Sequence, residues 1–168
     1  AITTNHQFTV SVRIENTGTQ AVAFAKETWH VGTATPLNAH DTADALGVMW
    51  YDGEKSRDIL GWVSTPGFLC IPTSPRNDAT ESSPSIVWAA PHNQYFALIT
   101  IPDKPATNLL AERVELPPPS AEQLAADPQA KARPAGVQTS LVFPGNSIAP
   151  GKAVERRFNV YAGPKEYY

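Results

Sequence analysis

The chain has 168 residues, of which 42% are hydrophobic, and its 13 basic and 16 acidic residues give a formal net charge of −3. A globular chain of this size buries about 70% of its unfolded surface and can fold without disulfides, and its single cysteine, Cys70, cannot form an internal one. The slight acidic excess argues against nucleic acid as a partner, because phosphate backbones attract an excess of Lys and Arg. No apolar run approaches the roughly 18 to 20 residues that cross a bilayer.

The first part of the chain predicts short strands separated by turns. Residues 8–15 alternate apolar and polar side chains, as in a strand with one buried face. Residues 16–19 (NTGT) predict a tight turn, so the run 21–29 is expected to return as the hairpin partner of the first strand. Further short runs bounded by turn residues predict strands at 46–51, 59–63, 68–71, 85–90 and 95–101.

The second part predicts three more strands, at 109–116, 137–143 and 153–161, and one short helix. Three prolines at 117–119 end the first of these strands. Ser120 and Gln123 then form a capping box for a helix that ends near Asp127. The Pro- and Ala-rich segment 117–136 is therefore expected to be an exposed insertion. Its part 127–136 is expected to be mobile, because it has hardly any large apolar residue to bury.

This order of elements predicts one all-β domain over residues 1–168. Roughly nine or ten short strands with turns between them are typical of an antiparallel β-sandwich. A doubly wound fold would need helices between the strands, and the sequence does not predict them.

Residue spacing argues against a metal or phosphate site. No two of the four histidines have the spacing that brings two imidazoles to one ion: His6, His30, His40 and His92. The polar group formed by Asn38, His40, Asp41 and Asp44 is interpreted as a turn rather than as a set of metal ligands. Segment 145–152 has two glycines and a lysine, but the spacing differs from that of a phosphate loop, and a strand follows it. It is interpreted as a turn between two strands.

The motifs of acyl transfer are also missing, since the chain has no Gly-x-Ser-x-Gly elbow. Cys70 lies in the apolar run 67–71 and is interpreted as a buried thiol rather than a nucleophile. No catalytic residue, metal or cofactor is predicted. The tryptophans could stack on sugar rings or fill the space between the sheets, and their apolar surroundings favour the second interpretation: Trp29, Trp50, Trp62 and Trp88.

Three stretches of the chain resemble a known family. Residues 157–167 (RFNVYAGPKEY) resemble the segment that closes the large periplasmic domain of bacterial YidC-type membrane protein insertases. Residues 86–102 are similar to that family's tryptophan-containing strand, its Gln-Tyr-Phe step and the Ile-Pro that follows. Residues 8–18 resemble the strand and Asn-x-Gly turn found earlier in the same domain.

The resemblance implies a β-supersandwich, the fold type shared with sugar mutarotases, of which this chain would hold the C-terminal portion. It also implies a non-catalytic domain on the periplasmic face of the inner membrane, attached to the membrane through segments outside this chain. The parent protein would insert and fold inner-membrane proteins. The implied partners are the Sec accessory subunits SecD and SecF and client membrane proteins.

Gly163, Pro164 and Lys165 are expected to form the junction between this domain and a transmembrane helix that follows. Pro164 cannot continue a strand ladder, while its fixed φ suits the first turn of a helix. Lys165, Tyr167 and Tyr168 would begin an amphipathic segment near lipid headgroups, where basic and aromatic side chains are favoured.

Two other classes of protein compete with this interpretation. A sugar-binding or mutarotase-like module would need an acid and a base in one cleft, and His92 with Glu81 or Glu112 is the best pair that the sequence offers. An immunoglobulin-type sandwich ranks lower, because the Cys-Trp-Cys arrangement is missing.

Overall fold

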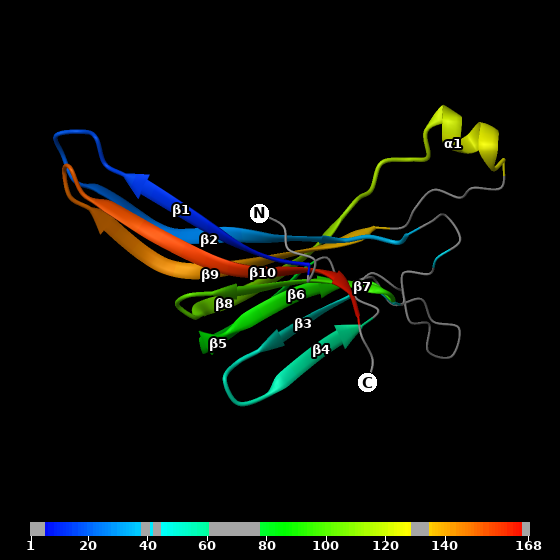
Figure 1. Ribbon diagram of the computed structural model, residues 1–168, viewed down its shortest axis with the longest axis horizontal. Helices are drawn as coiled ribbons and strands as arrows, with labels where there is room; N and C mark the ends of the chain where they lie inside the picture. Colours follow the sequence, from blue (N-terminus) through cyan, green and yellow to red (C-terminus); the bar gives the residue numbers. More distant parts are fainter. Residues whose placement is uncertain (1–5, 38–40, 42–44, 61–77, 129–134, 166–168) are drawn as a thin grey trace.

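A computed structural model describes the chain at residues 6–37, 41, 45–60, 78–128 and 135–165 (Figure 1). These residues form ten strands and one short helix: β1 Gln7–Glu15, β2 Val22–Ala34, β3 Gly47–Tyr51, β4 Ser56–Leu60, β5 Asp78–Ile86, β6 Trp88–His92, β7 Phe96–Pro102, β8 Ala106–Val114, α1 Ala121–Ala126, β9 Gly136–Ile148 and β10 Ala153–Pro164. The strand expected at 68–71 lies outside the described residues, and so do Cys70 and Trp62. The predicted all-β antiparallel sandwich is confirmed.

The strands form two sheets that pack face to face. The first sheet has six strands in the order β1-β10-β7-β6-β3-β4, and the second has four in the order β2-β9-β8-β5. Every pairing is antiparallel. β10 lies inside the first sheet, because it pairs with β1 along 153–161 and with β7 along 158–164.

The expected hairpin between the first two strands is wrong. β1 pairs with β10 and β2 pairs with β9, so the chain crosses from one sheet to the other at residues 16–21. Asn16 explains the crossing, because its buried side chain donates to the carbonyl oxygens of Gln20 and Ile148. The β9–β10 connection crosses back at the same end, where the Asn16 amide donates to the Lys152 oxygen.

The single strand expected at 85–90 is also wrong. β5 ends at Ile86 in the second sheet, and β6 begins at Trp88 in the first. A shift of register between Ser82 and Ile86, around Pro84, bends β5 before this corner. At the corner itself the Val87 amide donates to the Tyr51 oxygen of β3.

The ends of other strands differ from the expected ones. The strands expected at 46–51, 95–101 and 109–116 correspond to β3, β7 and β8. The strand expected at 59–63 shares its first two residues with β4, and its last three lie outside the described residues. β9 and β10 each continue beyond the expected 137–143 and 153–161. Because β9 includes Gly145, the turn expected at 145–152 is limited to the residues between Ile148 and Ala153.

Aromatic and aliphatic side chains from both sheets fill the core. Phe158 of β10 stacks on Trp29 of β2 with ring centroids 4.0 Å apart, and Phe143 of β9 meets its edge. Trp50 is buried, and Trp88 is half-buried against Tyr51. The core-filling interpretation of the tryptophans is confirmed for Trp50, which belongs to the core cluster, and for Trp29, which packs against it.

The short helix lies apart from the two sheets (Figure 1). Its capping box is the expected one, since the Gln123 amide donates to the Ser120 hydroxyl and the Gln123 side chain accepts from the Ser120 amide. No residue of α1 is buried, which confirms that the helix is not a core element. Residues 129–134 of the expected mobile loop lie outside the described residues. Among the described residues, no helix has the length and hydropathy of a membrane span.

Candidate functional site

The end of β10 is held inside the first sheet. Gly163 pairs with Ala97 and Pro164 with Phe96, so the ladder reaches Pro164 and the strand ends there. Proline is tolerated here because it is the last residue of the strand, and the next donor is the Lys165 amide, 2.7 Å from the Tyr95 oxygen.

Tyr161 closes over this end of the strand. Its hydroxyl donates to the Pro164 oxygen at 2.6 Å. A Cβ at Gly163 would lie 2.8 Å from that hydroxyl and 3.0 Å from the His6 Cβ. A side chain at position 163 would therefore force the Tyr161 ring to move.

A buried histidine links the chain exit to two strands of the first sheet. His92, the last residue of β6, is 1% exposed. Its Nε2 lies 3.0 Å from Oδ1 of Asp58 on β4, and its Nδ1 lies 2.9 Å from Nζ of Lys165. We call Asp58, His92 and Lys165 the exit cluster.

The chemistry of the partners fixes the protons of this cluster. A lysine ammonium can only donate, so Nδ1 of His92 accepts from Lys165. Nε2 then carries the ring proton and donates it to the Asp58 carboxylate. The imidazole is neutral in this arrangement, and both of its nitrogens are engaged.

Backbone packing leaves room for the imidazole only because its neighbour on β3 is a glycine. A Cβ at Gly47 would lie 2.7 Å from Nε2 of His92. The β6–β7 turn, which follows His92, is ordered by Asn93. The Asn93 side chain accepts from the amides of Tyr95 and Phe96 and donates to the Thr35 oxygen. The turn is thereby tied to the end of β2, and it presents the Tyr95 oxygen to the chain exit.

Two hollows lie at opposite ends of the sandwich. A hollow of about 310 Å³ borders the exit cluster and is lined by the ends of β2, β6, β7 and β10, including His92 and Gly163. A hollow of about 510 Å³ lies at the crossover end and is mainly apolar, with Phe24 and Ile148 in its wall. Ile14 and Val22 at its rim are 43% and 51% exposed.

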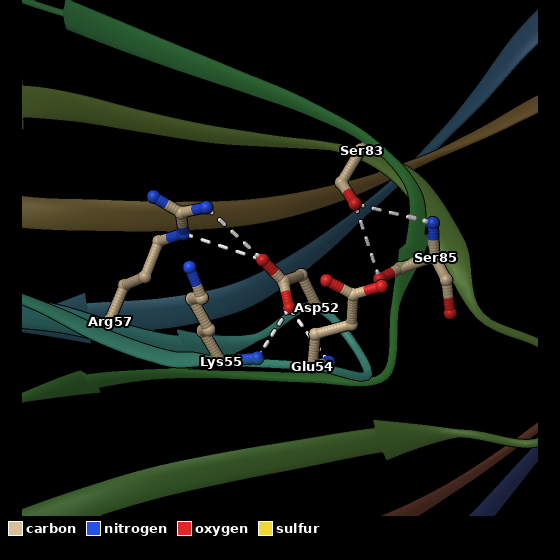
Figure 2. A network of polar contacts seen from close by, with 6 residues as sticks. All are labelled: Asp52, Glu54, Lys55, Arg57, Ser83 and Ser85. Atoms are coloured by element: carbon tan, nitrogen blue, oxygen red, sulfur yellow. Dashed lines mark hydrogen bonds and ion pairs between the residues drawn. The ribbon is translucent and has the colours of Figure 1, made fainter.

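A polar turn positions the strand that supplies Asp58. Figure 2 shows the Asp52 carboxylate at the centre of the β3–β4 hairpin, where it accepts from the Lys55 and Glu54 amides at 2.7 and 2.9 Å and pairs with Arg57 at 3.2 Å. The pKa of the Asp52 carboxyl is held below its ordinary value of 3.8. The largest cause is the hydrogen bond from the Lys55 amide, followed by that from the Glu54 amide, and the Arg57 guanidinium adds to them.

The other candidate residues of the sequence lie elsewhere. Glu81 on β5 and Glu112 on β8 belong to the second sheet, while the ring of His92 contacts Asp58 and Lys165 instead. Asp41 accepts from the Leu37 amide, as in a turn, and the other residues of that polar group lie outside the described part. No group of three or more potential metal ligands occurs in the described ranges.

Sequence reasoning missed the exit cluster. Asp58 and Lys165 are 34 and 73 residues from His92, and no motif connects them. A local signal existed only for Lys165, which lies in the Gly-Pro-Lys step.

The fold and the exit cluster define an antiparallel β-sandwich module with a firmly anchored C-terminal strand. The family model of the YidC periplasmic domain matches residues 1–168, and the chain therefore belongs to that family. The description of this family indicates a location in the periplasm. None of the curated protein sequences matches the chain.

Solved structures give the fold a second comparison. A candidate aldose 1-epimerase from Escherichia coli K12 is 13% identical, with a TM-score of 0.51, and the match covers 95% of this chain and 57% of that one. A candidate mutarotase from Salmonella typhimurium is 9% identical, with a TM-score of 0.45, over 94% of this chain and 50% of that one. The chain thus spans between half and three fifths of the length of these structures. The first likeness indicates a shared fold and nothing about activity.

Proposed function

We propose that this domain assists the insertion and folding of inner-membrane proteins through direct contacts, without catalysing a reaction. The observation that carries the proposal is the family match over residues 1–168. The proposed partners are the Sec accessory subunits SecD and SecF and the chains of client membrane proteins.

Two features of the surface support contacts with extended polypeptides. β1 and β2 are edge strands on the two sheets, and an edge strand can pair with a strand of a partner. The apolar hollow of about 510 Å³ opens beside both of them and can receive apolar side chains of such a strand. We therefore propose the crossover end as the contact surface.

The state of His92 supports a non-catalytic role. General acid–base catalysis needs a proton donor or acceptor within reach of a substrate. In the exit cluster both ring nitrogens already have partners, and the imidazole is buried. A sugar-isomerising site built on His92 has no support in this arrangement.

We also propose that Gly163, Pro164 and Lys165 join the domain to a transmembrane segment of the parent protein. Tyr95 and Phe96 are exposed beside this junction, at 52% and 46%. Aromatic and basic side chains are favoured at the level of lipid headgroups. This end of the sandwich would therefore face the bilayer, and the crossover end would face the periplasm.

Site-specific photo-crosslinking in the full-length parent protein tests both contacts. A benzoylphenylalanine at Ile14 or Val22 is expected to give adducts with SecD, SecF or a client chain, and one at Tyr95 is expected to label lipid. Leu124 on α1, which is 42% exposed, provides a control position of similar exposure. Adducts no stronger at Ile14 and Val22 than at Leu124 would reject the proposed contact surface.

A further inference from the structure

Nδ1 of His92 faces two groups that need opposite protonation states. The ammonium of Lys165, at 2.9 Å, requires an unprotonated nitrogen that accepts. The carbonyl oxygen of Asn93, at 3.4 Å, requires a protonated nitrogen that donates. Only one of these hydrogen bonds can exist at a time, and a single proton decides which.

We propose that the exit cluster is a proton-operated latch on the end of β10. With a neutral imidazole the latch is closed, and Lys165 is bound to His92. When Nδ1 takes up a proton, it turns from acceptor to donor and bonds to the Asn93 oxygen. The imidazolium then repels the Lys165 ammonium, and the latch opens.

Groups of opposite charge contact the two nitrogens of the imidazole. The Asp58 carboxylate, on β4, favours the imidazolium, and the Lys165 ammonium opposes it. Gly47 of β3, which lies against the ring, is uncharged. Histidine is the side chain that ordinarily changes charge between pH 5 and 8.

The latch matters because Pro164 weakens the ladder at this point. Pro164 has no amide proton, so the next hydrogen bond beyond it is that of the Lys165 amide with the Tyr95 oxygen. The side chain of the same residue is held by His92. Opening the latch therefore loosens the hydrogen bond that ties Lys165 to the β6–β7 turn. This inference concerns the chain itself and does not depend on the partners proposed above.

Amide hydrogen exchange of the 168-residue chain, followed by NMR, tests the latch. The protection factor of the Lys165 amide, corrected for intrinsic exchange, is expected to fall about tenfold between about pH 7.5 and about pH 5.5, as one charge-assisted hydrogen bond is lost. At the higher pH, the ring ¹⁵N shifts of His92 are expected to show a protonated Nε2 and a bare Nδ1.

Variants separate the latch from a general effect of acid. Lys165→Met removes the ammonium and leaves His92 itself in place. The backbone amide of residue 165 is then expected to show low protection that no longer depends on pH. His30→Gln, at an exposed histidine of β2, is expected to leave the wild-type pH dependence unchanged. The proposal is overturned if wild-type protection is the same at both pH values, if Lys165→Met keeps the full pH dependence, or if His92 carries its proton on Nδ1.

Discussion

Asp52 illustrates how a single carboxylate can organise a turn. One of its oxygens accepts from two successive backbone amides, and the other pairs with Arg57, which stands next to Asp58 in β4 (Figure 2). These amides would otherwise need water as a partner. The carboxylate therefore orders the hairpin from which the exit cluster takes its acidic member.

The lowered pKa of Asp52 makes the hairpin sensitive to acid. Since the pKa is lower in the folded chain than in the unfolded one, the carboxylate stabilises the fold above pH 3.8, and this contribution is lost as the pH falls through the folded value. A titration of the Asp52 carboxyl by ¹³C NMR is expected to give a midpoint below 3.8. In Arg57→Gln the midpoint is expected to stay below 3.8, because the backbone amides are the larger cause. A midpoint at the ordinary value in that variant would contradict this account.

At the scale of single residues, the sequence predicts what depends on near neighbours. The capping box of Ser120 and Gln123 lies within four residues and is found as expected. The packing of Trp29 and Trp50 at the core follows from their apolar runs. The contacts of His92 could not be predicted, because they join residues that are close only after the strands of the first sheet have paired.

Among the elements, the alternation of side chains predicts where strands occur but not which sheet they join. The turn at 16–19 reverses the chain as expected, yet the reversal leads into the other sheet. A turn within a hairpin and a turn that crosses between sheets can have the same local sequence. The sequence also does not reveal the change of sheet at Val87, because the strands on its two sides follow one another without a polar turn between them.

The extension of β9 beyond Phe143 depends on a glycine. A Cβ at Gly145 would lie 2.4 Å from the backbone oxygens of Phe24 and Ala25 on β2, and backbone atoms cannot move aside as a flexible side chain can. We expect Gly145→Ala to lower the free energy of unfolding by about 1–3 kcal/mol, the range typical of overpacking. Urea denaturation would measure the loss.

Ser147→Ala is the matched control for this substitution, because Ser147 is exposed on the same strand. Its effect should stay within about 0.5 kcal/mol. Equal stability of the Gly145→Ala variant and the wild type would show that β2 and β9 can separate at this position at no cost.

For the whole molecule, the two sheets are joined at one end by two crossings of the chain. Asn16 connects these crossings, since its side chain donates to the oxygens of Gln20 and Ile148 and its backbone bonds with Lys152 and Gly151. Farther along, Arg156 of β10 forms a two-bond ion pair with Glu27 of β2 across the sheets, at 2.9 and 3.0 Å.

Asn16→Ala is expected to destabilise the sandwich without changing its topology. The substitution leaves two carbonyl oxygens without their donor, at a cost of about 2–3 kcal/mol. For a chain of this size the melting temperature should fall by about 5–10 °C. Thr17→Ala, at the exposed neighbour, is the control and should melt within about 1 °C of the wild type. Calorimetry decides between these outcomes, and an unchanged melting temperature for Asn16→Ala would show that water replaces its side chain.

The position of β10 between β1 and β7 determines how the domain responds to mechanical force. A pull on Lys165 acts along the strand axis, while the hydrogen bonds to both neighbours run across it. Tension would therefore load two ladders in shear at the same moment, instead of opening one bond after another. A pull through this strand would therefore meet the resistance of both ladders before the sandwich opened.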